Sequence, residues 1–122
     1  VPKAFPALMR SWKIQKRAAR VGFDWDTAAD TLPKVHEEAD EVLDALKKGD
    51  APAIAEEIGD LLFACVNAAR KAGVDPELAL AAATQEFTNR FIKMEELILS
   101  EGGCLSDMTL EQMDSYWDRI KK

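Results

Sequence analysis

Apolar residues recur along this chain at the three- and four-residue spacing of α-helices. Two stripes are clearest: Val35, Ala39, Val42, Leu43 and Leu46 in one segment, and Ile54, Ile58, Leu61, Leu62, Cys65 and Ala69 in the next. We expect these stripes to pack together. Phe63 and Val66 extend the apolar surface of the second segment around the helix, so this helix should contact neighbours on more than one side. Because no segment sustains an alternating pattern, we predict an all-α fold of the four-helix-bundle type, to which a second copy of the chain can contribute.

Glycine, proline and capping residues mark where these helices start and stop. Asp50 and Asp75 precede proline-containing segments as N-caps, Gly49 offers a C-cap, and Thr109-x-x-Gln112 has the form of a capping box. The segment FDWDTAAD is expected to be a loop. We predict helices from about Pro6 to Val21, from Thr31 or Leu32 to Lys48, from after Asp50 to about Ala72, from Pro76 to about Leu99, and a short one carrying Tyr116 and Trp117.

The length and composition are those of one globular domain. The chain has 122 residues, of which 48% are hydrophobic and 31% charged, and we expect a single domain over residues 1–122. No apolar run approaches the roughly 18 residues that a membrane span needs, and no signal peptide is recognisable. Neither cysteine has metal or disulfide spacing, so we expect reduced thiols in the cytoplasm and no membrane partner. The Val-Pro start suggests a piece cut from a longer protein.

Charge is unevenly distributed along the chain. The net charge is -6, yet residues 1–23 carry six Lys/Arg and no acidic residue, which leaves ten basic and 22 acidic residues in the remainder. The acidic total argues against nucleic acid as a partner. A basic segment facing an acidic one suits a polyphosphate that binds together with a metal ion.

The acidic residues around Gly49 form a symmetric pattern. Glu41 and Glu57 lie eight residues before and after this glycine, and Glu38 and Asp60 lie eleven residues before and after it. In an antiparallel hairpin both pairs lie about 12 to 16 Å from the turn, so four carboxylates can converge. Oxygen-only ligands favour Mg²⁺, with Mn²⁺ as a substitute.

Other interpretations of these carboxylates are weaker. A merely solvated acidic helix face is the main competitor, and the symmetry about the turn counts against it. His36 is the only histidine, and no Glu-x-x-His motif is present, which disfavours a ferritin-like di-iron site. A Ser-His-Asp triad built on His36 has no supporting motif either.

The same residues carry a family resemblance. EEADE (residues 37–41) followed by EIGD (residues 57–60) resembles the E-E-x-x-E…E-x-x-D signature of the all-α nucleoside triphosphate pyrophosphohydrolases. The chain is most similar to the catalytic C-terminal unit of the MazG family, from PALMRSWKIQKRAARVGFDW through KVHEEADEV and FTNRF to LEQMDSYW.

The resemblance implies a homodimeric enzyme that hydrolyses (d)NTPs to the monophosphate and pyrophosphate with Mg²⁺. It implies Glu38, Glu41, Glu57 and Asp60 as metal ligands, with Glu37 as a further carboxylate of the catalytic motif. Candidate substrate-binding residues are Lys13, Lys34, Arg90 and Trp117, which match family positions, and Asn67, two helical turns beyond Asp60. We expect Trp12 and Trp25 to be core or lid aromatics.

One segment departs from the family pattern. The family's K-F-x-R-R-F run reads E-F-T-N-R-F here, so Glu86 replaces a lysine and Asn89 an arginine. Fewer cations should weaken triphosphate binding. Two alternatives therefore stay open: a related pyrophosphohydrolase acting on dUTP, dCTP or phosphoribosyl-ATP, and a nucleotide-binding dimerisation module with weakened turnover.

Overall fold

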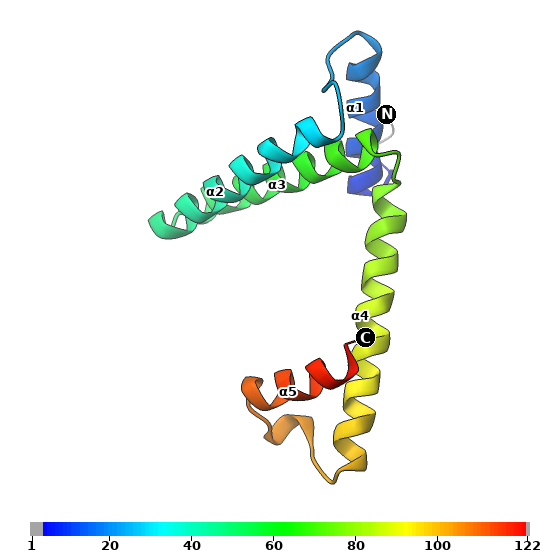
Figure 1. Ribbon diagram of the computed structural model, residues 1–122. Helices are drawn as coiled ribbons and strands as arrows, with labels where there is room; N and C mark the ends of the chain where they lie inside the picture. The colour runs from blue at the N-terminus through cyan, green and yellow to red at the C-terminus, as the bar shows by residue number, and fades with distance from the viewer. Residues whose placement is uncertain (1–3, 122) are drawn as a thin grey trace. The chain divides into compact units, whose positions relative to one another are not determined.

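The structure is a computed structural model that describes residues 4–121, and the secondary structure over these residues is helical (Figure 1). Its elements are α1 (Ala7–Arg20), η1 (Ala29–Thr31), α2 (Leu32–Lys48), α3 (Ala51–Lys71), α4 (Pro76–Ser100), η2 (Leu105–Asp107) and α5 (Leu110–Ile120). The predicted all-α class is confirmed. Among these helices none is both long and apolar enough to cross a membrane. Val1 and Pro2, from which we expect a longer parent chain, lie outside the described residues.

The helix boundaries follow from local capping interactions. Gly49 ends α2 in the left-handed conformation at φ 69°, which glycine adopts without a steric penalty. Asp50 accepts a hydrogen bond from the backbone N–H of Ala53, and Asp75 caps the start of α4 in the same way. The Thr109 capping box forms both of its hydrogen bonds. The two short 3₁₀ helices η1 and η2 were not predicted, since each is a single turn inside a segment with loop composition.

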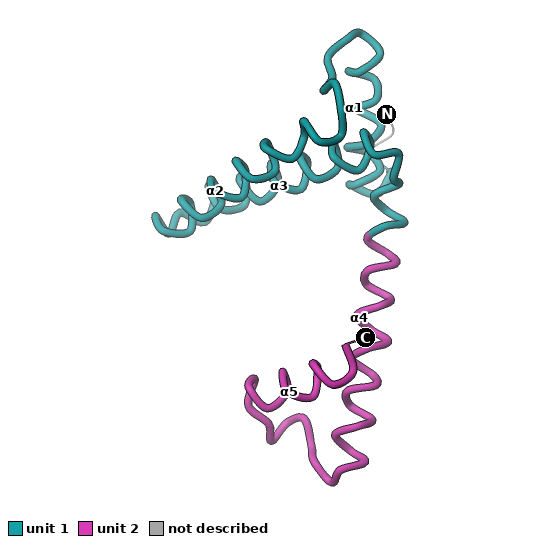
Figure 2. Tube along the Cα trace, in the orientation of Figure 1, with its two compact units in different colours: residues 1–79 teal, residues 80–122 magenta. Residues whose placement is uncertain are grey.

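The chain divides into two compact units, residues 1–79 and residues 80–122 (Figure 2). In the first unit α2 and α3 run antiparallel as a hairpin that turns at Gly49, and α1 packs against the half of α3 far from this turn (Figure 1). The side chains of Ala45, Ala64 and Val66 are buried in this unit, together with Thr31. This packing positions the acidic residues of α2 and α3 opposite one another.

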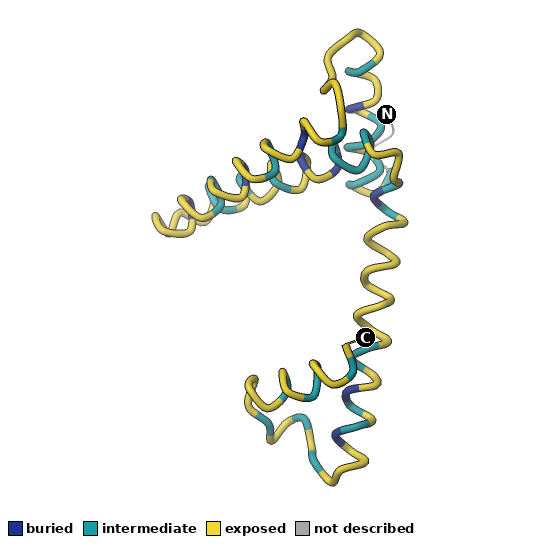
Figure 3. Tube along the Cα trace, in the orientation of Figure 1, coloured by how far each residue is buried: buried dark blue, intermediate teal, exposed yellow. Residues whose placement is uncertain are grey.

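Much of the predicted apolar stripe is exposed (Figure 3). Leu43, Leu46, Ile58 and Leu62 are 49%, 54%, 42% and 52% exposed, and Ala39 and Cys65 are also exposed. The expectation that the two stripes bury each other is therefore only partly met, because two helices in contact cover just the line between them. That a helix from a second copy of the chain covers these exposed residues stays a prediction.

The second unit contains α4 from Leu80 onward, η2 and α5. Met94 and Ile98 of α4 are buried. The Phe87 ring lies 5.4 Å from the Trp117 ring, measured between centroids, so α5 packs an aromatic side chain against α4. The Glu101 carboxylate accepts hydrogen bonds from the Tyr116 hydroxyl at 3.0 Å and from Arg119 at 2.9 Å, and these bonds connect the end of α4 to α5.

Candidate metal centre

Three glutamates meet between α2 and α3. One carboxylate oxygen from each of Glu38, Glu41 and Glu57 lies within 4.8 Å of the other two. Glu38 and Glu41 are three residues apart and therefore share one face of α2. Glu57 lies on α3 at the same distance along the chain from the Gly49 turn as Glu41, so the antiparallel hairpin brings it to the same height.

The cluster is partly buried, and two of its oxygens lack a partner. Glu38 is 5% exposed, and its Oε1 pairs with Lys34 Nζ at 3.0 Å. Its Oε2 is buried without a hydrogen-bond partner, as is Oε2 of Glu57. Leaving a buried charged acceptor unsatisfied is costly in a folded protein. These two oxygens need a positively charged or hydrogen-bonding ligand.

The neighbouring carboxyl groups raise the pKa of the third glutamate. A hydrogen bond that protonated Glu41 donates to Glu57, followed by the negative charge of Glu38 and burial, raises the pKa of Glu41 to about 7. Near neutral pH this carboxyl group is thus about half protonated. Three carboxylates this close together repel one another, and a bound cation would offset this repulsion. Carboxylate oxygens are the ligands that Mg²⁺ and Mn²⁺ prefer. The donor set therefore fits a hard divalent ion.

Asp60 and Glu37 lie outside this cluster. Asp60 is exposed and does not join the three clustered carboxylates, although its distance from the turn matches that of Glu38. The convergence of four carboxylates is therefore met for three of them. Lys34 pairs with Oε1 of Glu38 at 3.0 Å and also with exposed Glu37 at 3.4 Å. The roles of Asp60 as a fourth ligand and of Glu37 in catalysis stay predictions.

The two lysines predicted to bind substrate differ in their surroundings. Lys34 is held by the cluster, and the hydrogen bond to Glu38 raises the pKa of its ammonium group above the ordinary value. Lys13 of α1 lies over the Phe5 ring at 5.1 Å and near the Trp12 ring at 5.8 Å, both measured to the centroid. Lys34 is therefore next to the acidic cluster, and Lys13 makes cation–π contacts within the N-terminal segment.

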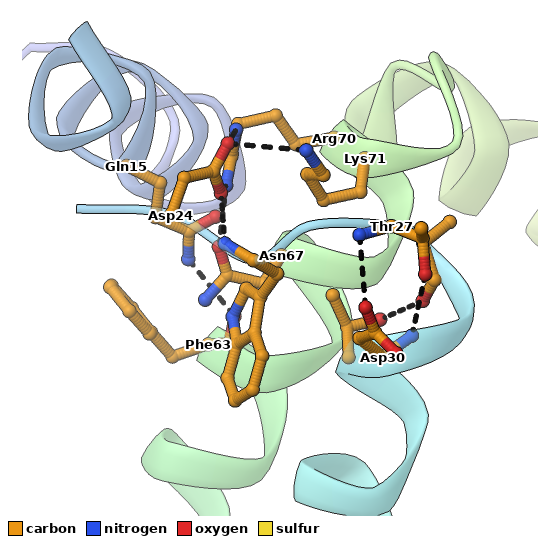
Figure 4. A network of polar contacts seen from close by, with 11 residues as sticks. Gln15, Asp24, Thr27, Asp30, Phe63, Asn67, Arg70 and Lys71 are labelled. Carbon is orange, nitrogen blue, oxygen red and sulfur yellow. Dashed lines mark hydrogen bonds and ion pairs between the residues drawn. The ribbon is translucent and has the colours of Figure 1, made fainter. Parts of the chain in front are cut away.

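Asn67 lies in a separate polar network (Figure 4). Its Oδ1 accepts a hydrogen bond from Arg70 at 3.1 Å, and Arg70 also binds both carboxylate oxygens of Asp24. The guanidinium group holds the pKa of Asp24 well below its ordinary value. Asn67 also lines a pocket between α1 and α3, together with Trp25 and the buried Gln15. We did not predict Gln15, although a glutamine on the apolar face of the first helix was a usable signal.

Arg90 and Trp117 belong to the second unit. Arg90 forms an ion pair with Glu86 at 2.5 Å, one turn earlier on α4. Trp117 of α5 packs against Phe87, which lies three residues before Arg90 and so on the same face of α4. The guanidinium group that we expect to bind phosphate thus already has an anionic partner within its own helix.

Comparison with known proteins is consistent with this geometry. Residues 26–97 match the family described as the MazG nucleotide pyrophosphohydrolase domain. The chain is 43% identical over 124 residues to a protein of Escherichia coli strain K12 named nucleoside triphosphate pyrophosphohydrolase, covering 100% of the chain and 47% of that protein. It is 44% identical over 116 residues to a Thermotoga maritima protein named nucleoside triphosphate pyrophosphohydrolase/pyrophosphatase MazG, covering 95% of the chain and 44% of that protein. The chain thus spans less than half the length of either relative.

Proposed function

The chain belongs to the family of MazG nucleotide pyrophosphohydrolase domains, and from this premise we propose that it hydrolyses nucleoside triphosphates to the monophosphate and pyrophosphate with a divalent metal ion. The printed names of the Escherichia coli and Thermotoga maritima relatives support this reaction class. We propose Mg²⁺ as the natural ion and Mn²⁺ as a substitute. Residues 1–122 would act as one catalytic domain.

The observation that carries the proposal is the pair of unsatisfied buried oxygens in the acidic cluster. Oε2 of Glu38 and Oε2 of Glu57 are buried without partners, next to Glu41 with its raised pKa. Glu38, Glu41 and Glu57 would hold the ion, and Asp60 would complete the set from the next turn of α3. When bound, the ion supplies positive charge to the triphosphate oxygens and makes a coordinated water more acidic.

The remaining side chains would orient the substrate. The Lys34 ammonium group pairs with Oε1 of Glu38, and Glu37 shares the same ammonium group. We propose that Lys13, Arg90 and Trp117 bind the nucleotide. A cytoplasmic homodimer is also proposed, since exposed leucines and isoleucines of the α2–α3 hairpin need cover and both cysteines are free thiols.

A second candidate is a nucleotide-binding module with weak turnover. It is favoured by one observation, the Glu86–Arg90 ion pair, because a carboxylate on this guanidinium group competes with substrate phosphate. Mg²⁺ and nucleotide would then raise the melting temperature without product formation over hours.

The deciding experiment is a Mg²⁺-dependent pyrophosphate-release screen over common and modified nucleoside triphosphates. We expect pyrophosphate and monophosphate from at least one of them, with activity lost in Glu41→Gln, Glu57→Gln and Asp60→Asn. The matched control is Glu56→Gln, which neutralises the exposed residue immediately before Glu57. Release of orthophosphate without any pyrophosphate would refute the proposed reaction type.

A further inference from the structure

Lys34 joins the partly buried acidic cluster to the exposed face of α2. Its Nζ lies 3.0 Å from Oε1 of Glu38 and 3.4 Å from Oε2 of Glu37. The Glu38 side chain is 7% exposed, whereas those of Lys34 and Glu37 are 42% and 58% exposed. Residues three and four positions apart are neighbours on a helix surface, so one turn of α2 is enough to build this bridge. The ammonium group therefore connects a buried carboxylate with an exposed one.

The two oxygens of the Glu38 carboxylate have different surroundings. Oε1 pairs with the Lys34 ammonium group, and Oε2 is buried without a hydrogen-bond partner. Glu38 also places a carboxylate oxygen within 4.8 Å of oxygens of Glu41 and Glu57. Carboxylates that bind metal ions are commonly held by an outer partner, which sets their orientation and so tunes the affinity for the ion. Lys34 stands in the position of such an outer partner.

A contact with substrate is the competing role for Lys34. The family resemblance implies this role, and the half-exposed ammonium group is accessible to a ligand. Transfer of the ammonium group to a phosphate would, however, remove the counter-ion of the buried Glu38 carboxylate. Breaking a buried ion pair in this way is costly, because it leaves an uncompensated charge. The contacts of Lys34 therefore favour Glu38 over a phosphate as its lasting partner.

We propose that Lys34 is a positioning residue of the metal centre, which holds Glu38 through Oε1 and leaves Oε2 for the divalent ion, with Glu37 as the outer anchor of the ammonium group. This inference rests on the proposed function, because it requires Glu38 to bind the ion. It gives Lys34 a role in metal binding in place of a direct contact with the nucleotide.

The test measures metal binding in the absence of nucleotide. Isothermal titration calorimetry with MnCl₂ at pH 8 compares the wild-type protein with two variants of Lys34. Lys34→Met keeps a similar length and removes the charge, and it should raise the Kd for Mn²⁺ about tenfold. Lys34→Arg keeps a charge that pairs well with carboxylates, so its Kd should stay close to the wild-type value.

Two further variants separate positioning from a general effect of charge. Lys48→Met removes a lysine about 21 Å further along α2 and should leave the Kd unchanged. Glu37→Gln removes the outer anchor but keeps the Lys34–Glu38 pair, so the Kd should rise much less than in Lys34→Met. If only charge mattered, removing the positive charge of Lys34 would lower the Kd, and removing the negative charge of Glu37 would raise it.

Steady-state kinetics provides a second measurement. Once Mg²⁺ is raised until it saturates Lys34→Met, the KM for the nucleoside triphosphate should return to the wild-type value, because Lys34 acts through the ion. A direct contact with phosphate would instead raise the KM at every Mg²⁺ concentration. It would also leave the Mn²⁺ Kd without nucleotide unchanged.

Three results would overturn the inference. They are an unchanged Mn²⁺ Kd in folded Lys34→Met, tighter Mn²⁺ binding in this variant, or a Lys34→Arg variant as weak as Lys34→Met. Tighter binding would show that the ammonium group competes with the ion for Glu38. Circular dichroism melting curves monitor folding, and Lys34→Gln, with the same expected Kd, replaces Lys34→Met if that variant does not fold.

Failure of the proposed function gives different results. If the wild-type protein binds Mn²⁺ but releases no pyrophosphate from any nucleoside triphosphate, the proposed reaction fails, and the comparison of Kd values still decides the role of Lys34. If the wild-type protein binds no Mn²⁺, the metal centre and this inference fail together.

Discussion

Lowering the pH from 8 to 6 should weaken divalent-metal binding about tenfold, because a proton on Glu41 competes with the ion. Glu41 clusters with Glu38 and Glu57, and the carboxyl groups of Glu57 and Glu38 raise its pKa to about 7. The ion needs the deprotonated carboxylate as a ligand. Protonation of this one side chain is therefore a direct measure of whether the three glutamates form a single metal site.

The magnitude follows from the fraction of protein with a deprotonated Glu41. With a pKa of about 7, roughly nine tenths of the molecules are deprotonated at pH 8 and roughly one tenth at pH 6. The apparent Kd for Mg²⁺ or Mn²⁺ should rise by the ratio of these fractions, about tenfold. A glutamate with the ordinary pKa of about 4.3 would change the Kd by only a few per cent over this interval.

The assay is isothermal titration calorimetry with MnCl₂ at half-unit pH steps, in buffers that do not bind the metal. Binding should release close to one proton per site at pH 6, which is detected by repeating the titration in buffers of different ionisation enthalpy. His36→Gln, which removes the only histidine of the sequence, serves as the control and should keep the pH dependence.

A Kd that stays constant between pH 6 and 8 in the wild-type protein would refute this reasoning. Loss of the pH dependence in His36→Gln, with Glu41 intact, would refute it as well. Glu41→Gln should bind the metal more weakly at pH 8 and show little further change at pH 6, because the titrating carboxyl group is absent.

Three further predictions concern stability and charge. Without metal, the melting temperature should fall as the pH rises from 5 to 8. The folded-state pKa of Glu41 is raised to about 7, so its contribution to stability is fully present below the pKa of the unfolded state and is lost as the pH rises through about 7. Thermal scans at several pH values check this, and Glu41→Gln should flatten the pH dependence of the melting temperature. Glu86→Lys should raise kcat/KM several-fold by freeing Arg90 from its ion pair and adding a cation, measured by pyrophosphate release. Asp24→Asn should destabilise the first unit by about 1 to 2 kcal/mol in urea unfolding, because its carboxylate holds Arg70 and Lys71.

Each of these predictions has a contradicting result. A metal-free melting temperature that rises or stays level between pH 5 and 8 contradicts the first. No gain of activity in Glu86→Lys counts against the charge explanation of this departure from the family pattern. Asp26→Asn, in the same loop, is the control for Asp24→Asn, and equal destabilisation by both variants would show that the ion pairs contribute nothing specific.

Helix boundaries were predictable from sequence because their causes are local. The Asp50 side chain caps a residue three positions later, and Gly49 adopts a backbone conformation that depends on its own missing side chain. The meeting of Glu38, Glu41 and Glu57 was also predictable, since it needs only helical rise and a hairpin turn at a known residue.

Features set by tertiary packing were harder to predict from the sequence. The place of Asp60 outside the cluster depends on how α2 and α3 face each other, which residue spacing alone does not specify. The exposure of Leu46 and Leu62 likewise depends on how many helices surround the hairpin. Gln15 reaches a backbone carbonyl 48 residues away, and no local pattern encodes that contact.

The most direct test of the account is an anomalous-scattering crystal structure with Mn²⁺ and a non-hydrolysable nucleoside triphosphate analogue. We predict a manganese peak bounded by carboxylate oxygens of Glu38, Glu41 and Glu57, with Asp60 turned in as a fourth ligand and the triphosphate beside it. Well-ordered nucleotide with no manganese peak between these side chains, and with their carboxylates turned toward solvent, would contradict the account.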